Sequence, residues 1–377
     1  MIRRLYVHNF RCLENFELPI SGLSSVLLIG SNGSGKTTVG LALEILQKIA
    51  RGTNQVGELV RPEDLSRGRS DVPMRIEIEV ELERRVHRYA IALELPKGSK
   101  ELHILEERLD IDGEVVYARE AEQIQLAFKP STSLAEMGRA QKNKFPIDRQ
   151  FVALPLIHER LLSDPLVMFK QWLGRIIILR PVPSLIYGDS SRETLQPNPQ
   201  VSDIGAWFSG ILSDAPSSWA RIDQHLRQVM PDFKEIKNLR VGRDSKSLAV
   251  HFASDQGSLE VPFGDLSDGE KCFVICALVL ATHDANGGVF CFWDEPDNYL
   301  ALSEVGHFIL ALRRAYQSGG QFIATSHNPE AIRRFSHENT LVLYRKSHLE
   351  PTMVRPLSEL QVNGDLVGAL VRGDLEP

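Results

Sequence analysis

The stretch Gly30-Ser31-Asn32-Gly33-Ser34-Gly35-Lys36-Thr37 decides the fold, because it matches the pattern GxxxxGK[ST]. An apolar run, Ser25–Ile29, leads into it, and Thr37–Ile49 follows with apolar residues at helical spacing. Glycines in such a loop let successive backbone N–H groups turn towards phosphate oxygens, and the helix N-terminus adds partial positive charge. The pattern therefore predicts a nucleotide site built from strand, loop and helix.

The loop residues have separate expected roles in holding a nucleotide. Lys36 is placed to reach the β- and γ-phosphates, and the Thr37 hydroxyl is placed to ligate Mg²⁺. The other positions bind phosphate oxygens mainly through their backbone N–H groups. The predicted binding residues are Gly30, Ser31, Asn32, Gly33, Ser34, Gly35, Lys36, Thr37 and Thr38.

Composition places the 377-residue chain among ordinary globular proteins, with 43% hydrophobic and 24% charged residues. No apolar run reaches the length of about 20 residues that a membrane span needs. Residues 1–7 alternate like a strand and lack the features of a secretory signal. A net charge of −6, from 43 basic and 49 acidic residues, gives no general case for nucleic-acid binding. We expect a cytoplasmic protein without a membrane partner.

The cysteines form no CxxC pair and no spacing typical of a zinc site. Three of them lie in strongly apolar stretches. We therefore predict core thiols in a reducing cytosol, which excludes a secreted disulfide scaffold. The cysteines are Cys12, Cys272, Cys276 and Cys291.

The first 120 residues contain patterns typical of β-strands. Apolar and polar residues alternate along Met74–Leu82 and again along Tyr89–Leu95. Asp112-Gly113, between two further short strand patterns, is a strong hairpin signal. These features predict an antiparallel sheet beside the strand–loop–helix unit.

The middle of the chain differs in composition and in the pattern of its apolar residues. The segment 125–150 is punctuated by Pro, Ser, Gln and Lys, which indicates a mobile surface segment. Leu156–Ile178 and Ile204–Met230 carry apolar stripes, so both are predicted to be mainly helical. We find no internal repeat and no sustained heptads, which argues against a long coiled-coil arm.

After residue 245, strand-like and helical stretches alternate, as in a mostly parallel and covered sheet. The strand-like stretches are Ser247–Ala253, Val289–Trp293, Gln321–Thr325 and Thr340–Tyr344. The helical stretches are Glu270–Ala281 and Leu302–Tyr316.

The apolar strand that ends at Trp293 leads into two carboxylates. Asp294, at its tip, is predicted to hold Mg²⁺, and Glu295 is placed to polarise an attacking water. Adjacent carboxylates at a strand end could instead cap a following helix. The phosphate loop in the same chain favours the catalytic interpretation.

Two further motifs occur near helix and strand ends. In Leu266–Lys271, Ser267 and Glu270 form a capping box, while Ser267 and the Gly269 amide also suit an anion site at a helix N-terminus. His327 follows the strand that begins at Phe322. It is either a surface histidine or a γ-phosphate sensor that orients water. The second interpretation is favoured because His327 occurs in the same chain as the phosphate loop, the Ser267 motif and the acidic strand end.

These four motifs, GSNGSGKT, LSDGE, FWDEP and ATSHN, together resemble the ABC-type ATPase head and occur in that family's order. The chain further resembles the RecF/SMC/OLD-like "AAA family ATPase" group. Leu5–Leu13 is similar to that group's opening NFR strand, and Asp294–Leu300 to its DExExxLHP segment. The resemblance implies an α/β P-loop NTPase of ABC-ATPase head type, with a mostly parallel core sheet, an antiparallel β-subdomain and a helical lobe.

The resemblance also implies a division of the chain into three parts. Residues 1–120 would form the N-terminal half of the head with the phosphate loop and the β-subdomain. Residues 121–245 would form the helical lobe. Residues 246–377 would form the C-terminal half, with the signature motif Leu266–Glu270, the strand that ends at Asp294 and Glu295, and His327.

Heads of this family hydrolyse ATP with Mg²⁺ in a two-subunit sandwich, so the resemblance implies a homodimer or larger assembly. Each nucleotide would lie between the phosphate loop of one copy and Ser267–Gly269 of the other. Lys36, Glu295 and His327 would be the catalytic residues, with Glu295 as general base.

The chain departs from the family pattern in three places. Leu300-Ala301-Leu302 stands where the group often has Leu-His-Pro, and the loop glutamine is not assigned, with Gln150 and Gln171 as candidates. No acidic cluster of the TOPRIM nuclease type follows residue 345. We therefore expect an OLD-like head without its own nuclease domain.

Three functions remain open from the sequence. The first is an ATP-driven dimeric switch that controls a separate DNA-directed effector, such as a nuclease, in antiviral defence or DNA repair. The second is a RecF-like repair ATPase that binds DNA directly. The third, a transporter ATPase subunit, is disfavoured because about 230 residues separate Lys36 from Leu266. The basic residues that could line a DNA surface are Arg67, Arg69, Arg84, Arg85 and Arg88, or Lys142, Lys144 and Arg149.

Overall fold

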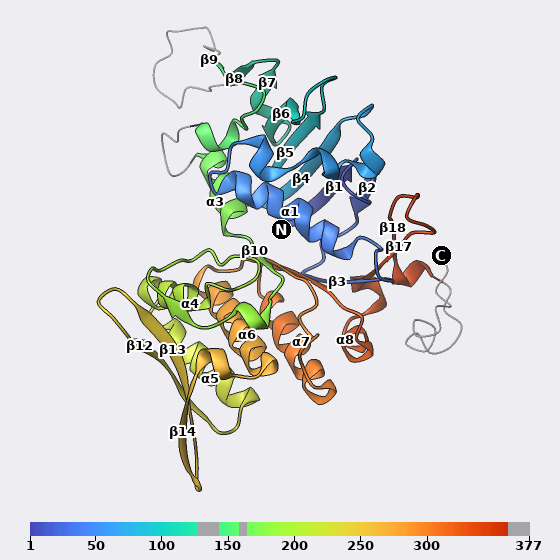
Figure 1. Cartoon of the computed structure of the whole chain (residues 1–377). Helices are drawn as coiled ribbons and strands as arrows, with labels where there is room; N and C mark the ends of the chain where they lie inside the picture. Colours follow the sequence, from blue (N-terminus) through green and yellow to red (C-terminus); the bar gives the residue numbers. More distant parts are fainter. Residues whose placement is uncertain (127–142, 158–163, 361–377) are drawn as a thin grey trace. The chain divides into compact units, whose positions relative to one another are not determined.

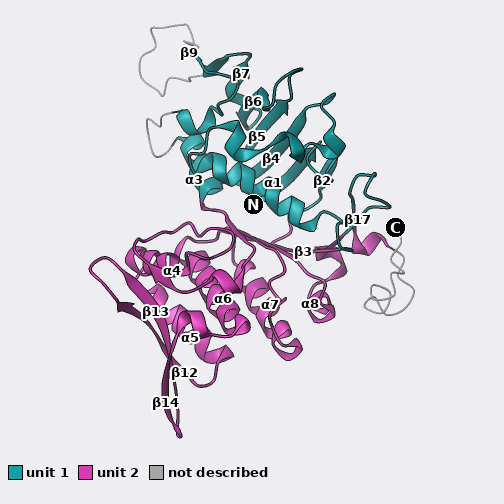
Figure 2. Cartoon of the chain, viewed as in Figure 1, with its two compact units in different colours: residues 1–22, 30–174, 343–355 teal, residues 23–29, 175–342, 356–377 magenta. Residues whose placement is uncertain are grey.

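The computed structural model describes residues 1–126, 143–157 and 164–360, which belong to two compact units (Figures 1 and 2). Unit 1 combines residues 1–22, 30–174 and 343–355. Unit 2 combines residues 23–29, 175–342 and 356–377. Each unit therefore contains segments that are far apart in the sequence. The three-part division expected from the family resemblance stays a prediction.

Unit 1 contains an eight-stranded antiparallel sheet in the order β2-β1-β4-β5-β6-β7-β8-β9. The hairpin between β6 and β7 turns at Asp112 and Gly113, whose φ angles are 52° and 82°. Two positive φ angles in a two-residue turn match the twist of the strands, as the Asp-Gly pair predicted. The strands are β1 (Ile2–His8), β2 (Phe16–Leu18), β4 (Met74–Leu82), β5 (Arg85–Glu94), β6 (His103–Ile111), β7 (Glu114–Glu120), β8 (Gln123–Leu126) and β9 (Asn143–Pro146).

The described residues of unit 1 include the helices α1 (Lys36–Ala50) and α2 (Val56–Leu59), and all of α3 (Pro165–Arg175) except its last residue. The predicted helix Leu156–Ile178 is wrong at its C-terminal end, where residues 177–179 form a strand of the parallel sheet. That short run is apolar at every position, so periodicity cannot separate a buried strand from a helix there. Most of the predicted surface segment 125–150 lies outside the described residues, as do residues 158–163.

A buried carboxylate joins β6 of unit 1 to the chain that follows β9. Glu107 is fully buried and accepts hydrogen bonds from the hydroxyls of Tyr89 and Tyr117, at 3.2 and 2.9 Å. It also accepts from the backbone N–H groups of Ala153 and Leu154. Burial raises the pKa of Glu107, and these donors offset part of that cost.

A second sheet has the order β10-β15-β16-β3-β17-β18, and its neighbouring pairs from β10 to β17 are parallel. Its strands belong to unit 2, except that residues 343–355, at the end of β17 and in most of β18, belong to unit 1. Every residue of β3, β15 and β16 is buried. Continuous apolar strands without alternation are typical of a parallel sheet covered on both faces, so this prediction is confirmed. The strands are β3 (Ser25–Ile29), β10 (Ile177–Leu179), β15 (Phe290–Trp293), β16 (Gln321–Thr325), β17 (Thr340–Tyr344) and β18 (Met353–Pro356).

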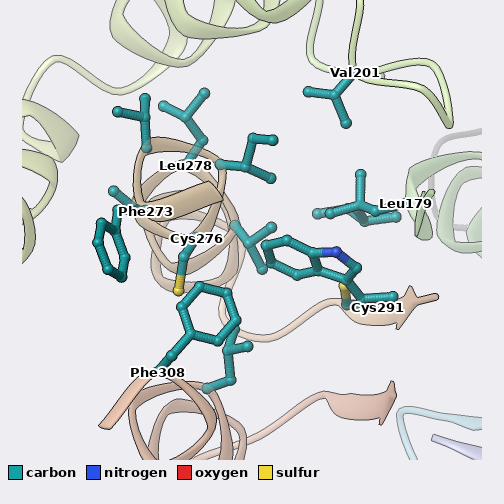
Figure 3. Packing of buried hydrophobic residues seen from close by; sticks show 14 of the residues in the cluster. Leu179, Val201, Phe273, Cys276, Leu278, Cys291 and Phe308 are labelled. Atoms are coloured by element: carbon teal, nitrogen blue, oxygen red, sulfur yellow. The ribbon is translucent and has the colours of Figure 1, made fainter. Parts of the chain in front are cut away.

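The hydrophobic core of unit 2 surrounds α6 (Figure 3). Phe273, Cys276 and Leu278 of this helix pack with Cys291 of β15 and Phe308 of α7. Because α6 is buried on nearly all sides, it needs no polar face. The helices of unit 2 are α4 (Ile204–Asp214), α5 (Ser218–Val229), α6 (Asp268–Ala285), α7 (Leu302–Tyr316) and α8 (Pro329–Arg333).

The predicted core thiols are confirmed at three positions. Cys272, Cys276 and Cys291 are buried free cysteines, whereas Cys12 is half-buried. Burial raises the pKa of Cys272 to about 12, so this thiol is unreactive at neutral pH.

A separate antiparallel sheet of unit 2 corrects one expectation. Ser247–Ala253 was predicted to join the parallel alternation, but it lies in β13, which pairs antiparallel with its neighbours. The connections of β13 to β12 and β14 are short, and parallel strands would need a long crossover. The strands are β11 (Asp189–Ser190), β12 (Phe233–Arg240), β13 (Lys246–Ser254) and β14 (Gly257–Pro262).

Within residues 1–126, 143–157 and 164–360, every helix is too short or too polar to cross a bilayer.

Candidate nucleotide site

The phosphate loop begins directly after β3 and ends at the start of α1, as the sequence predicts. Gly30, Gly33 and Gly35 have φ angles of 148°, 77° and 100°, which side chains rarely adopt. The Lys36 Nζ donates to the carbonyl oxygens of Gly30 and Ser31, at 2.8 and 3.2 Å. The lysine head therefore lies over the loop, where a phosphate would need it.

The loop is also closely surrounded. A Cβ atom on Gly30 would lie 2.0 Å from the Leu343 carbonyl oxygen. A Cβ on Gly35 would lie 2.9 Å from both the Cys12 Sγ and the Thr352 Oγ1. Only glycine fits these two positions, for reasons of space as well as backbone conformation.

The chemistry of the loop fits a nucleotide phosphate with Mg²⁺. The Ser34 Oγ is buried and has no hydrogen-bond partner among the described residues, so a phosphate oxygen would satisfy it. Thr37, at the helix start, is exposed and could offer its hydroxyl to a cation. The Thr38 Oγ1 accepts a weak hydrogen bond from the Cys12 Sγ at 3.6 Å.

In unit 2, Asp294 and Glu295 follow the C-terminal end of β15. The Thr325 hydroxyl, at the end of β16, donates to the Asp294 Oδ1 at 2.6 Å. The same hydroxyl accepts from the Glu295 backbone N–H at 2.9 Å. Because Thr325 is fully buried, it fixes the two acidic residues against each other.

The Glu295 carboxylate has two further neighbours. The His327 Nε2 lies 3.5 Å from the Glu295 Oε1, and the Asn298 side chain donates to the Glu295 Oε2. Both Glu295 and His327 remain partly exposed, so solvent reaches the pair. A carboxylate held beside an imidazole can orient and deprotonate a water molecule.

Asp297 is the buried member of the acidic cluster. Its carboxylate is only 3% exposed and accepts a hydrogen bond from the Ser326 hydroxyl at 2.8 Å. Burial raises the pKa of Asp297 to about 6. The negative charge of Glu295 also raises this pKa, whereas the hydrogen bond from Ser326 lowers it. Asp297 therefore changes its charge close to neutral pH.

The signature motif forms the predicted capping box at the start of α6. The Glu270 N–H donates to the Ser267 Oγ at 3.3 Å, and the Ser267 N–H donates to the Glu270 Oε2 at 2.8 Å. A Cβ on Gly269 would lie 3.0 Å from the Tyr299 carbonyl oxygen. The helix start thus packs against the loop that follows Asp297 in the same unit. An anion-binding role for Ser267 and Gly269 stays a prediction.

The predicted residues therefore fall into two groups. Unit 1 holds the phosphate loop, and unit 2 holds Asp294, Glu295, His327 and the signature. The strands that lead into Gly30, Asp294 and His327 are β3, β15 and β16, which belong to one parallel sheet.

Sequence reasoning missed two side chains of the acidic group, Thr325 and Asn298. Thr325 could have been found, because it ends a predicted strand two residues before His327. Asn298 lies within the Asp294–Leu300 segment that resembles the family motif, but the sequence gives no sign that it contacts Glu295. Of the glutamine candidates, Gln150 donates its amide to Glu101 at 2.9 Å, and the loop-glutamine role of Gln150 or Gln171 stays a prediction.

The fold and the loop define a P-loop ATPase of the SMC and ABC-like head type. Residues 25–333 match the family described as "AAA domain, putative AbiEii toxin, Type IV TA system", and the chain belongs to this family. A solved SMC head bound to the C-winged helix domain of ScpA covers 95% of this chain and 99% of its own, with TM-score 0.56 and 13% identity. At that identity the likeness concerns the fold alone.

Two curated proteins share short stretches with this chain. The OLD nuclease of Thermus scotoductus is 46% identical over 46 residues, which is 12% of this chain. The chromosome partition protein Smc of Chlorobaculum tepidum is 30% identical over 101 residues, or 26% of this chain. Each match spans 8% of the relative's length. This chain therefore shares only a small part of either relative's length.

Proposed function

We propose that this chain binds and hydrolyses ATP with Mg²⁺, and acts as a dimeric switch that controls a separate effector protein. The observation that carries the proposal is the arrangement around Glu295. The Thr325 hydroxyl bridges Asp294 to the Glu295 backbone, while His327 lies 3.5 Å from the Glu295 carboxylate. This arrangement suits a general base with an orienting partner.

The residues have defined roles in this proposal. The loop amides and Lys36 would bind the phosphates, and Thr37 and Asp294 would hold Mg²⁺, which would neutralise phosphate charge. Glu295 accepts the proton of the attacking water, and His327 orients that water beside the γ-phosphate. Ser267 and the Gly269 amide of a second copy complete the phosphate contacts.

The packing of Gly269 supports a link between the two sites of the dimer. The Tyr299 carbonyl lies close to Gly269, and Asp297 of the same loop is bonded to Ser326, next to His327. A shift of the signature helix would therefore reach the loop and the histidine through two direct contacts.

The effector is proposed from the relatives. One solved head is bound to a domain of a separate protein, ScpA, and one short match is to an OLD nuclease. A head that acts through a partner with DNA-directed chemistry, such as a nuclease, in antiviral defence or DNA repair fits both precedents.

Direct DNA binding by this chain is less supported, because most of the candidate basic residues that the structure describes, though not Arg84, are paired with acids. Arg67 and Arg69 both contact Glu14, and Arg85 contacts Asp112. Lys144 and Arg149 likewise have carboxylate neighbours, and Lys142 lies outside the described residues. Paired charges release few counterions on binding DNA.

Glu77 pairs with three arginines on the sheet of unit 1. Burial alone would raise its pKa, but Arg75, Arg88 and Arg4 lower the pKa of Glu77 to about 2. The carboxylate therefore stays charged and holds all three arginines.

The test compares the wild type with Glu295→Gln, by phosphate release and by size in solution with and without ATP and Mg²⁺. We expect the variant to lose at least about 100-fold in hydrolysis, to retain ATP and to accumulate as a dimer or larger assembly. Ser267→Arg should lose that assembly, because the added side chain blocks the shared site.

Glu338→Gln, which changes an exposed glutamate of the same unit, is the matched control and should behave as the wild type. If Glu295→Gln still hydrolyses ATP, Glu295 is not the general base. Full activity in a strict monomer would contradict the shared site.

A further inference from the structure

The hairpin between β17 and β18, here residues 343–355, belongs to the same unit as the phosphate loop. It contacts both ends of that loop, although about 310 residues separate the two segments in the chain. The Leu343 carbonyl oxygen lies 2.0 Å from the position of a Cβ on Gly30, and the Thr352 Oγ1 lies 2.9 Å from that of a Cβ on Gly35. The hairpin therefore forms one wall of the phosphate loop.

Arg345 connects the turn of this hairpin to the middle of the loop. Its Nη1 donates to the Gly33 carbonyl oxygen at 3.3 Å. Its Nε and Nη2 donate to the carbonyls of Ser347 and His348, at 3.0 and 2.6 Å. The Nε2 of His348 lies 3.8 Å from the position of a Cβ on Gly33. One guanidinium thus holds the turn closed and fastens it to the loop.

The far side of the hairpin is anchored as well. The Arg67 Nη1 donates to the Leu349 carbonyl at 2.6 Å, and its Nη2 pairs with Glu14 at 2.6 Å. The Thr352 N–H donates to the Cys12 carbonyl at 2.9 Å. These contacts tie the hairpin to the chain that leads from β1, so it is held from two sides.

We propose that Arg345 is a positioning residue for nucleotide binding, and that the 345–349 turn is coupled to occupancy of the phosphate loop. The physical reason is the direction of the Gly33 carbonyl. A carbonyl oxygen that turned towards the bound phosphates would repel them, and Arg345 binds this one. The guanidinium also adds positive potential beside an anion site.

Coupling between the turn and the loop is reciprocal. If Arg345 holds the loop ready for ATP, bound ATP must hold Arg345 and its turn in place by the same free energy. The inference rests on the proposed function, because it assumes that this loop binds ATP.

The experiment measures ATP·Mg²⁺ affinity by calorimetry for the wild type, Arg345→Ala and Arg355→Ala. Arg355 is an exposed arginine of the same hairpin that lies over the Tyr344 ring, so its removal changes charge equally. We expect Arg345→Ala to bind ATP about tenfold more weakly, with KM raised and kcat little changed. Arg355→Ala should match the wild type.

Hydrogen exchange on the wild type gives an independent measurement if Arg345→Ala folds poorly. Amides of residues 345–349 should exchange more slowly when ATP is bound. Equal affinities for the two arginine variants, together with unchanged exchange in the turn, would overturn the inference while leaving the proposed function intact. A wild type that binds no ATP would instead overturn both.

Discussion

The phosphate loop and the acidic strand end are held in different ways. Gly30, Gly33 and Gly35 shape the loop through backbone angles and close backbone contacts. Asp294 and Glu295 are held by side-chain hydrogen bonds, with the Thr325 hydroxyl at their centre. Added volume should therefore damage the loop, whereas a change of polarity at constant volume should damage the acidic strand end.

The largest expected effect is that of Gly30→Ala on the loop. Its Cβ would lie 2.0 Å from the Leu343 carbonyl, at a φ of 148° that alanine rarely adopts. Strain and overlap together should lower the free energy of unfolding by about 4 kcal/mol, with ATP binding lost. Denaturant titration and calorimetry measure the two quantities.

Gly33→Ala is the matched control for volume. Gly33 also has a positive φ, of 77°, but its Cβ would meet only the end of the His348 side chain, at 3.8 Å. The backbone cost of about 1 kcal/mol should then be the whole effect on stability. Equal losses in the two variants would show that backbone angle, and not space, decides the loop.

This comparison also explains what the sequence could predict. The loop, the capping box and the Asp-Gly hairpin each depend on a few neighbouring residues. Their local structure could therefore be predicted from the sequence. The wall formed by Leu343 and Arg345 was not, because it depends on packing between segments about 310 residues apart. The buried Glu107 was hidden for the same reason, since its donors come from three separate parts of unit 1.

The second prediction concerns charge at the acidic strand end. The pKa of Asp297 is raised to about 6 in the folded state, above the ordinary value of about 4 in the unfolded state. The folded protein therefore binds the extra proton, and its stability falls as pH rises through this window. Asp297→Asn should remove about 2 kcal/mol of this loss between about pH 4.5 and about pH 7.5.

Denaturant titrations of the wild type and the variant at both pH values measure this difference. The asparagine can still accept the Ser326 hydrogen bond, so volume and that contact are kept. A pH dependence unchanged by the substitution would mean that Asp297 is ionised across the whole range, and that burial does not control it.

The smallest expected effect belongs to Thr325→Val, which keeps volume and removes only the hydroxyl. Asp294 loses a donor and the Glu295 N–H loses its acceptor, so we expect hydrolysis to fall about tenfold, the equivalent of about 1.4 kcal/mol. ATP affinity measured without Mg²⁺ should stay unchanged, because the loop that binds the phosphates belongs to unit 1 and Thr325 bonds only the acidic pair of unit 2. Thr340→Val is the control, since Thr340 begins a strand of the same sheet and its hydroxyl donates to the Ser336 carbonyl rather than to an acid. If both variants lost hydrolysis equally, a general loss of stability in the sheet would explain the result. A loss confined to Thr325→Val would show that one hydroxyl sets the geometry of the base, because nothing else in the sheet has changed.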